Sequence, residues 1–267
     1  MRVFITGATG FIGTNLLQHL KGNDIYCYSH GQNVTEAIAR FTPDYIYHLA
    51  AQIYKDEEMF TSNVVLTHDI LEAVKNTPIK GMIYVGSSSE YGRKTKPMKE
   101  TDFLDPTTMY EATKGAASLL CQAYARTYNV PVVIARPFSV YGKHEPAHRF
   151  IPTLLRSYKF NLPIKVSPGV HDFIHVDDFC KGLKLVCENA FGIHGEIYNF
   201  GTGVMYSNEE VVQLIERLTK YTFDKELVGK MRPFDSQCWV CDNSKARSIG
   251  WKVETTLPEG LVKLLNV

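Results

Sequence analysis

Short apolar runs alternate with helical patterns along the first half of the chain. Runs rich in β-branched and aromatic residues, typical of buried strands, lie at 2–6, 24–29, 45–50, 82–87 and 130–136. Between them, apolar residues recur at helical spacing over 11–20, 36–41, 58–76 and 108–129. Buried strands that alternate with helices predict an α/β fold, in which a doubly wound parallel sheet carries helices on both faces.

After about residue 143 this alternation gives way to a different pattern. Four prolines interrupt the chain between 146 and 168, and a helical pattern follows at 209–220. The change predicts two interleaved parts. The first is a domain over 1–142, which a segment near 171–200 rejoins, and the second is a smaller α/β lobe over 143–267.

Composition places the chain among globular proteins and argues against several kinds of partner. Of its 267 residues 45% are hydrophobic, and 29 basic residues against 28 acidic ones leave a formal net charge of +1. That balance argues against a general nucleic-acid or anionic-membrane coat. No apolar run reaches the roughly 18 residues of a membrane span, and the N-terminus lacks the long apolar stretch of a signal peptide. We therefore expect a cytoplasmic protein.

The six cysteines are scattered through apolar segments, so no disulfides are expected in a cytoplasmic chain of this size. Cys238 and Cys241 form a CxxC pair. A zinc site requires a second ligand pair at similar spacing, and the sequence has none. We interpret the pair as part of a strand and expect no metal.

A glycine-rich turn joins the first strand to the first helix. It reads GATGFIG over 7–13, a GxxGxxG pattern. Glycine lets the backbone approach a pyrophosphate closely, and a helix N-terminus offers free N–H groups and about half a positive charge. Because the pattern lies between a strand and a helix, it predicts Rossmann-type binding of NAD or NADP. The residues expected at the cofactor are Gly7, Thr9, Gly10, Phe11, Ile12 and Gly13.

The choice between NAD and NADP depends on the end of the second strand. An acidic residue there would accept a hydrogen bond from the ribose 2′-hydroxyl of NAD. The sequence instead has Ser29 and His30, with no carboxylate and no arginine cluster for a 2′-phosphate. Since Ser29 and His30 can bind such a phosphate weakly, we lean slightly toward NADP and keep NAD open.

Two further motifs carry groups that can move a proton. Tyr110 and Lys114 form YxxxK at the start of a predicted helix, where residues i and i+4 share a face. A phenol with a pKa of about 10 is a poor base at neutral pH, but a neighbouring ammonium favours the phenolate. The serine run 87–89 closes the fourth predicted strand, at the edge where parallel sheets bind ligands. A hydroxyl there can hydrogen-bond a substrate while Tyr110 transfers the proton.

Together these motifs resemble those of the extended short-chain dehydrogenases/reductases, in particular the NAD(P)-dependent nucleotide-sugar epimerase/dehydratase family. The resemblance extends over nearly the whole chain. Besides the glycine turn and YEATK (110–114) it includes HLAA (48–51), SNV (62–64), SSSEYG (87–92), ARPFSVYG (135–142), HDFIHVDD (171–178), YNFGTG (198–203), RPFD (232–235) and DNSKARSIGW (242–251). It implies that the first domain binds the dinucleotide and that the C-terminal lobe binds a nucleotide-diphosphate sugar.

The resemblance also implies a role for each matching residue. Tyr110 is the general acid/base and Lys114 its partner, while Asn63 steadies the catalytic helix. The catalytic serine is Ser87, or Ser88 if this chain lacks one residue that many relatives have; the choice stays open. Further cofactor contacts are implied at Leu49, Ala50, Ala51, Lys114 and Pro137. Substrate contacts are implied at Ser87, Ser88, Ser89, Tyr110, Ser139, Arg149, Arg232 and Asp235.

The reaction stays open among four alternatives. The leading hypothesis is a nucleotide-sugar epimerase, in which Tyr110 takes a proton from a sugar hydroxyl and hydride passes to the cofactor and back. An NADPH-dependent 4-keto-6-deoxy-sugar reductase is favoured by the short chain and by the missing acid after the second strand. A 4,6-dehydratase ranks third, because Glu90 lies one residue closer to Tyr91 than the family's dehydratase acid. A non-catalytic cofactor-binding regulator ranks last, since the Ser/Tyr/Lys set is intact.

The expected partners are few. Neither the charge nor the motifs point to nucleic acid or to a membrane. The long helices expected at 58–76 and 108–129 can pair across a two-fold axis as a four-helix bundle, which predicts a homodimer. A sugar nucleotide and a second copy of the chain are therefore the partners that we expect.

Overall fold

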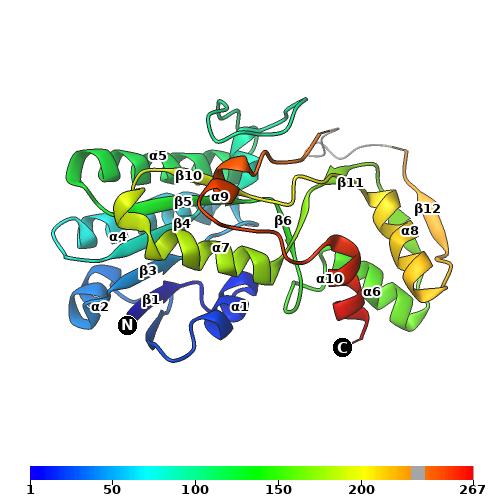
Figure 1. Ribbon diagram of the computed structural model, residues 1–267, viewed down its shortest axis with the longest axis horizontal. Coiled ribbons are helices and arrows are strands. Elements are labelled where there is room, and N and C mark those ends of the chain that lie inside the picture. Colours follow the sequence, from blue (N-terminus) through cyan, green and yellow to red (C-terminus); the bar gives the residue numbers. More distant parts are fainter. Residues whose placement is uncertain (230–237, 267) are drawn as a thin grey trace.

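Six parallel strands form the central sheet of the protein (Figure 1). They are β1 (Arg2–Thr6), β2 (Asp24–Tyr28), β3 (Tyr45–His48), β4 (Gly81–Val85), β5 (Val132–Pro137) and β10 (Ile197–Phe200). The structure is a computed structural model that describes residues 1–229 and 238–266. The strand order is β2-β1-β3-β4-β5-β10. Since β2 and β3 lie on opposite sides of β1, the switch point where such sheets bind ligands is at the carboxyl ends of β1 and β3.

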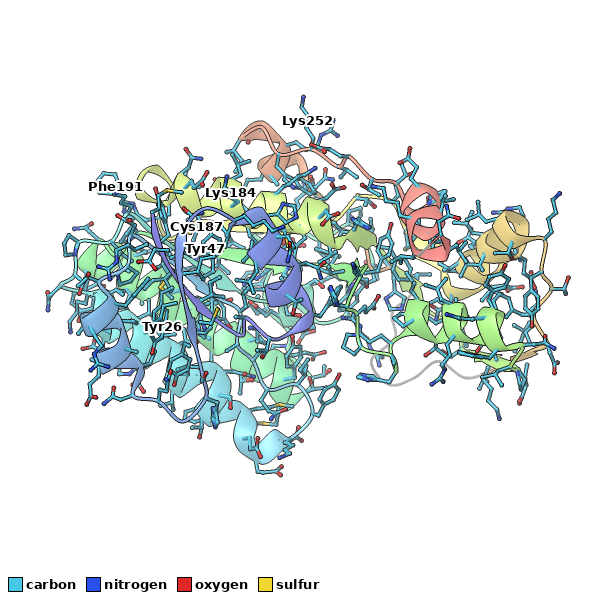
Figure 2. The ribbon with its side chains drawn as sticks, turned by 90° about the horizontal axis from the view of Figure 1, so that it is seen from below. Tyr26, Tyr47, Lys184, Cys187, Phe191 and Lys252 are labelled. Carbon is cyan, nitrogen blue, oxygen red and sulfur yellow. The ribbon has the colours of Figure 1, made fainter. Side chains whose placement is uncertain are left out.

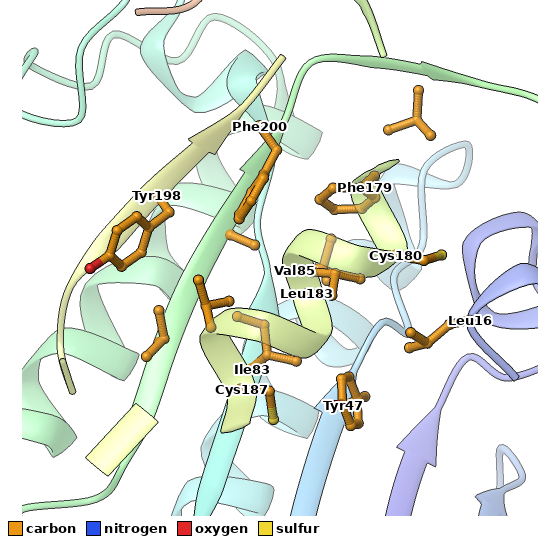
Figure 3. Packing of buried hydrophobic residues seen from close by; sticks show 14 of the residues in the cluster. Leu16, Tyr47, Ile83, Val85, Phe179, Cys180, Leu183, Cys187, Tyr198 and Phe200 are labelled. Carbon is orange, nitrogen blue, oxygen red and sulfur yellow. The ribbon is translucent and has the colours of Figure 1, made fainter. Parts of the chain in front are cut away.

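Helices cover both faces of this sheet. The helices α1 (Phe11–His19) and α7 (Val176–Glu188) pack on one face, and the other face carries α2 (Val34–Phe41), α4 (Leu66–Val74) and α5 (Met109–Tyr128). Figure 3 shows Leu183 and Cys187 of α7 against Val85 and Ile83 of β4. Burying each aliphatic side chain stabilises the fold by about 1.5–3 kcal/mol. The α/β fold with a doubly wound parallel sheet is therefore confirmed.

Helix α7 illustrates this packing. Cys187 lies beside Tyr47 in the interior, whereas Lys184 points outward from the same helix (Figure 2). An apolar stripe thus faces the sheet and a polar one faces water. Among the described residues, no helix is both long enough and apolar enough to cross a bilayer.

Local signals determine where α5 begins and ends. Thr108 caps the helix: its hydroxyl accepts a hydrogen bond from the Glu111 N–H, and its own N–H donates to the Glu111 carboxylate. At the other end Asn129 adopts the left-handed conformation (φ 54°), which stops the helix. The cap places Tyr110 in the first helical turn.

The single helix expected at 58–76 is instead three successive segments. α3 (Asp56–Met59) runs into a π-helix (Phe60–Val65), which continues as α4. Its wider turn shifts the directions of the side chains, and such turns are frequent at functional sites. Asn63 lies inside it and is buried. Apolar spacing could not reveal this segment, because a π-turn changes the register and not the residue types.

A smaller lobe is formed mainly by the C-terminal half (Figure 1). Its helices α6 (Phe150–Phe160), α8 (Asn208–Thr219) and α10 (Leu257–Leu265) share one apolar core. Its short strands pair as β7 (Ile164–Val166) with β12 (Lys225–Leu227) and β8 (Val170–His171) with β11 (Tyr206–Ser207). The strands β6 (Ser139–Tyr141) and β9 (Phe173–His175) pair with each other, and α9 (Ser244–Ser248) lies against β10. The domain limits at 142 and 143 stay a prediction.

Candidate active site

The glycine turn between β1 and α1 leaves no room for larger residues. Gly7 has a φ of +72°, and a Cβ on it would come within 2.8 Å of the Ala50 nitrogen. A Cβ on Gly13 would lie 2.2 Å from the Gly7 carbonyl oxygen. Gly10 is the N-cap of α1, and no side chain caps this end of the helix. The first N–H groups of α1 are therefore available to an anionic ligand.

The segment after β3 lies against this turn. The Leu49 N–H donates to the Thr6 carbonyl and the Ala50 N–H to the Thr6 hydroxyl, each at 3.2 Å. Ala51 and Thr9 are exposed, and Phe11 and Ile12 at the start of α1 are half-buried. The structure thus brings the glycine turn and the HLAA segment together at the carboxyl ends of β1 and β3.

The end of β2 carries polar residues and no acid. Ser29 and His30 are exposed, and the Ser29 N–H donates to the Gln32 side chain (3.1 Å). Glu58 of α3 lies in the same region, where its carboxylate accepts hydrogen bonds from Lys55 (2.7 Å) and Gln52 (2.8 Å). Nothing in the sequence links α3 to the end of β2, so this proximity was not predicted. The tight glycine cradle, the uncapped helix and these polar groups fit a dinucleotide.

Tyr110 and Ser87 meet at the carboxyl end of β4. The Ser87 side chain lies near enough to Tyr110 to act on its pKa. Burial raises the pKa of Tyr110, the neighbouring Ser87 lowers it, and the Glu90 charge raises it further. The structure thus pairs Tyr110 with Ser87, whereas Ser88 is buried (4% exposed) at the start of a 3-10 helix (Ser88–Tyr91).

A tight turn holds Ser87 in place. Ser87 is the N-cap of the 3-10 helix, and its N–H donates to the Glu90 carboxylate (2.8 Å). Its hydroxyl lies 2.6 Å from that of Ser89. Glu90 itself is buried in an ion pair with Arg136, so its carboxylate is occupied on the protein side.

Lys114 lies one turn along α5 from Tyr110 and is 2% exposed. Its Nζ donates to the Val85 carbonyl (2.5 Å) and lies 4.5 Å from the centre of the Tyr84 ring. Burial lowers the pKa of Lys114 to about 8, and the nearby Glu90 carboxylate opposes part of that shift. The ammonium therefore lies at the end of β4, where the serine turn begins.

A buried chain of hydrogen bonds runs from β1 toward α5. Thr6 contacts His48 Nδ1 (2.7 Å), and His48 Nε2 contacts the Thr67 hydroxyl (2.9 Å). Since Thr67 donates its own proton to the Asn63 carbonyl (2.7 Å), it accepts from His48, which places the imidazole proton on Nε2. Burial, with the Lys114 charge, lowers the pKa of His48 to about 3, so the ring is neutral.

The amide of Asn63 completes this chain. Its Oδ1 accepts from the Gln52 N–H (2.8 Å), and its Nδ2 donates to the Thr113 hydroxyl (3.0 Å). Thr113 lies on α5 between Tyr110 and Lys114. The π-helix thus ties the glycine-turn side of the sheet to α5. The sequence pattern named HLAA but gave His48 no role, although a histidine within an apolar strand was the available signal.

Two pairs of side chains lie on the side of Tyr110 nearest the C-terminal lobe. Arg149, the N-cap of α6, has its Nε 3.2 Å from Glu145 Oε1. The Glu145 side chain is 4% exposed, and burial raises its pKa to about 7. The Tyr54 hydroxyl lies 2.7 Å from His148 Nε2. Both Arg149 and Tyr54 lie near enough to shift the pKa of Tyr110. Sequence reasoning found only Arg149, since Tyr54 and Glu145 belong to no recognised motif.

The remaining predicted residues lie farther along β5 and β6. Pro137 ends β5 and Ser139 begins β6, with the Ser139 hydroxyl 3.2 Å from His171 Nδ1. The neighbouring Asp172 is fully buried and accepts hydrogen bonds from the Thr202, Gly203 and Cys241 backbones, so it joins separate segments of the fold. Arg232 and Asp235 lie outside the described residues.

Comparison with known proteins gives one family match. The family model described as the NAD dependent epimerase/dehydratase family matches residues 3–201. A trifunctional UDP-glucose 4,6-dehydratase/UDP-4-keto-6-deoxy-D-glucose 3,5-epimerase/UDP-4-keto-L-rhamnose-reductase from Arabidopsis thaliana is 32% identical over 250 residues. The match covers 87% of this chain and 36% of that protein, so the chain spans about a third of this relative's length.

Solved structures share the fold over the full length of the chain. MoeE5 in complex with UDP-glucose and NAD is 26% identical, with a TM-score of 0.90 over 100% of this chain and 98% of that one. UDP-glucuronic acid 4-epimerase from Bacillus cereus, in complex with UDP-glucuronic acid and NAD, is 23% identical, with a TM-score of 0.89 and the same coverage. At that identity the second likeness shows the fold alone.

Proposed function

The chain belongs to the NAD-dependent epimerase/dehydratase family, and we propose that it is a nucleotide-sugar epimerase acting by reversible hydride transfer at a sugar carbon. The observation that carries this proposal is the proximity of the Ser87 side chain to the Tyr110 phenol at the carboxyl end of β4. A hydroxyl pair of this kind can take a proton from a sugar hydroxyl and return it. The relatives whose names or structures include nucleotide sugars support the substrate class.

In the proposed proton transfer, each residue around Tyr110 has its own role. Tyr110, as phenolate, accepts the proton of the sugar hydroxyl and later gives it back. In this proposal Ser87 holds the same sugar oxygen by a hydrogen bond, and the Lys114 charge offsets part of the rise in the pKa of Tyr110 by favouring the phenolate. Asn63 holds α5 in place through Thr113. The chemistry that NAD supplies when bound is the reversible uptake of a hydride, so the cofactor ends unchanged.

The glycine turn and residues 49–51 would hold the dinucleotide, with the N–H groups of α1 at its pyrophosphate. The family description names NAD, and both structural relatives contain it. The preference for NADP drawn from Ser29 and His30 stays a prediction. Mass spectrometry of the nucleotide that co-purifies with the protein tests it.

Two other reactions would use the same residues. In a 4-keto-6-deoxy-sugar reductase, Tyr110 would give its proton to the carbonyl oxygen and NADPH would be consumed. A 4,6-dehydratase is supported by the name of the Arabidopsis relative. It requires an acid that reaches the sugar, and the Glu90 carboxylate is already paired with Arg136 and the Ser87 N–H. This engagement of Glu90 favours the epimerase.

We infer that the lobe over 143–267 binds the sugar nucleotide. Arg149 offers a guanidinium near Tyr110, and such a fork suits phosphate or a sugar hydroxyl. Arg232 and Asp235 stay predicted nucleotide ligands, and Ser89 and Ser139 stay predicted sugar contacts. Lowered affinity for a nucleotide sugar in Arg149→Ala and in Arg232→Ala, measured by calorimetry, is the expected result.

We also propose a homodimer and a cytoplasmic site of action. Exposed apolar side chains on the π-helix and α5 support pairing through α4 and α5: Phe60, Val65, Leu119 and Tyr128. Cys121, Cys180 and Cys187 are buried without a disulfide, in keeping with a reducing compartment. Light scattering that shows a monomer at micromolar concentration would exclude the dimer.

The reaction itself is tested with a panel of UDP-, dTDP-, GDP- and CDP-sugars, each incubated with NAD and followed by NMR. The epimerase predicts interconversion of two sugars with no net change in cofactor absorbance. Oxidation of NADPH with a 4-keto sugar would instead establish the reductase, and loss of water from the sugar would establish the dehydratase. Turnover of any kind that disappears in Tyr110→Phe excludes a regulator without catalysis.

A further inference from the structure

A buried ion pair lies behind the serine turn. The side chains of Glu90 and Arg136 are 0% and 2% exposed. Every other ion pair between described residues has at least one partner with clear solvent exposure. Glu90 belongs to the turn that carries Ser87, whereas Arg136 comes from β5. A pair of charges has therefore been removed from water beside the catalytic groups.

The carboxylate of Glu90 is held on both of its oxygens. One accepts a hydrogen bond from Arg136 Nε (2.8 Å) and lies 2.8 Å from Arg136 Nη2, and the other accepts from the Ser87 N–H at 2.8 Å. A Cβ on Gly86 would lie 2.4 Å from that second oxygen. The Arg136 guanidinium lies 4.5 Å from the centre of the Tyr91 ring. The Glu90 carboxylate thus lies between the Ser87 backbone and the Arg136 guanidinium, and its position is coupled to that of Ser87.

Stability alone does not account for this arrangement. Removing two charges from water costs several kcal/mol per ion, and apolar replacements of buried pairs are often neutral or stabilising. The pair is also incompletely satisfied, because Arg136 Nη1 has no hydrogen-bond partner among the described residues; the same holds for Ser118 Oγ, which like Glu90 lies beside Gly86. A buried ion pair that lacks some of its hydrogen bonds contributes less to stability than a fully bonded one, so a purely structural role does not explain it.

The charge of Glu90 acts on both proton-handling groups. It raises the pKa of Tyr110 and, against the effect of burial, that of Lys114. The titratable and charged groups that face Glu90 are Tyr84 on β4, Arg136 on β5, and Tyr110, Lys114 and Cys121 on α5. The Glu90 carboxylate thus lies close enough to act on the buried ammonium of Lys114 as well as on its ion-pair partner Arg136.

We propose that Glu90 is a positioning residue, which fixes Ser87 through its backbone N–H and keeps a buried negative charge near the Lys114 ammonium. This role rests on the proposed function, in that Tyr110 and Lys114 move the proton. It differs from the role of a dehydratase acid, because Glu90 acts through Ser87 and Lys114 and not on the sugar.

The test compares Glu90→Gln with the double variant Glu90→Gln/Arg136→Gln. Glutamine keeps the size and an oxygen for the Ser87 N–H, and the double variant also removes the guanidinium that would otherwise stay buried without a counter-charge. Ser118→Ala is the matched control, since it alters the same buried cluster without changing its charge. Thermal unfolding confirms that each variant is folded.

Direct titration needs no substrate. The Lys114 midpoint is followed by NMR of protein with 13C-labelled lysine, assigned with Lys114→Met. The Tyr110 midpoint is followed by tyrosinate absorbance relative to Tyr110→Phe. Both midpoints should fall by about 1–3 pH units in Glu90→Gln, as expected for loss of a close charge, should fall less in the double variant, which also loses the Arg136 charge, and stay unchanged in Ser118→Ala. Unchanged midpoints in folded Glu90→Gln would overturn the proposal.

Turnover then separates the two proposals. If the wild type is active, both limbs of its pH–rate profile should move to lower pH in the folded Glu90 variants. A uniform loss of activity at every pH, with unshifted limbs, would reduce Glu90 to a structural role and contradict the proposal. If the wild type converts no nucleotide sugar, the proposed function fails, whereas the titration still decides the role of Glu90.

Discussion

Tyr110 lies between two regions that are built differently. On the sheet side the polar side chains are at most 3% exposed and are joined by hydrogen bonds: Thr6, His48, Asn63, Thr67 and Thr113. On the lobe side Tyr54, His148 and Arg149 are exposed, and only Glu145 is shielded from water. Buried polar groups require their partners, whereas exposed pairs contribute little. The comparison shows that the fold itself fixes the side chains on the sheet side, while those on the lobe side, where we propose that the substrate binds, are free to adjust.

The largest expected effect is on the sheet side, at Tyr110. Tyr110→Phe keeps the ring and removes the proton-transfer group, so kcat should fall roughly 10²–10⁴-fold. Tyr54→Phe is the matched control on the lobe side and should cost only a few-fold. Steady-state rates of sugar interconversion give both numbers. Equal losses of kcat in the two variants would contradict the difference between the sheet side and the lobe side.

Asn63 tests the buried chain away from the reacting atoms. Asn63→Leu leaves the Gln52 N–H without its acceptor and the Thr113 hydroxyl without its donor. Displacement of α5 by as little as 1 Å should lower kcat by about 10²-fold, and the unpaired groups should lower the unfolding free energy by about 1–3 kcal/mol. Kinetics and urea unfolding measure the two effects. His148→Leu, which breaks the exposed pair on the lobe side, should change stability little; a loss as large as that of Asn63→Leu would contradict the contrast.

Gly13→Ala tests the close packing of the glycine turn. Its Cβ would meet the Gly7 carbonyl oxygen at 2.2 Å, so α1 must shift, at a cost of about 1–3 kcal/mol. Affinity for the dinucleotide, measured by calorimetry, should fall with it. Gly192→Ala is the control, because a Cβ there meets nothing within 4 Å. Equal stability of the two variants would show that the turn is not tightly packed.

The smallest effect is expected on the lobe side, at Glu145. Burial raises the pKa of Glu145 from 4.5 to about 7. The folded state therefore binds a proton more tightly than the unfolded chain, and the stability this provides is present below pH 4.5 and lost as the pH rises to about 7. The melting temperature should fall over this window in the wild type and fall less in Glu145→Gln. Parallel melting curves for both proteins across these pH values would contradict the buried state of Glu145.

Much of the sheet side could be predicted from the sequence, because its signals are local. The glycine turn, the strands and the YxxxK helix depend on neighbouring residues, and apolar spacing places that helix at 108–129, within a residue of its observed ends. The π-helix was missed for the reason that it alters register without altering composition. The pairing of Tyr110 with one serine depends on the shape of the 3-10 turn, which the run of three serines does not encode.

The lobe side was predicted less well, because its contacts join distant segments. Tyr54 contacts His148, which is 94 residues away in the sequence, and no pattern in either segment predicts that contact. The burial of Glu145 likewise depends on how the loop before α6 folds. Glu90 was interpreted only as a displaced acid, since its partner Arg136 lies in β5 and sequence spacing does not reveal buried pairs.

The fold places Ser87, and not Ser88, beside Tyr110. The most direct test of this pairing is kcat for Ser87→Ala and Ser88→Ala, measured side by side on the same nucleotide sugar. We expect a fall of about 10²-fold or more for Ser87→Ala, and little change in kcat for Ser88→Ala once its folding has been confirmed by thermal unfolding. The reverse result, with the loss confined to Ser88→Ala, would contradict it.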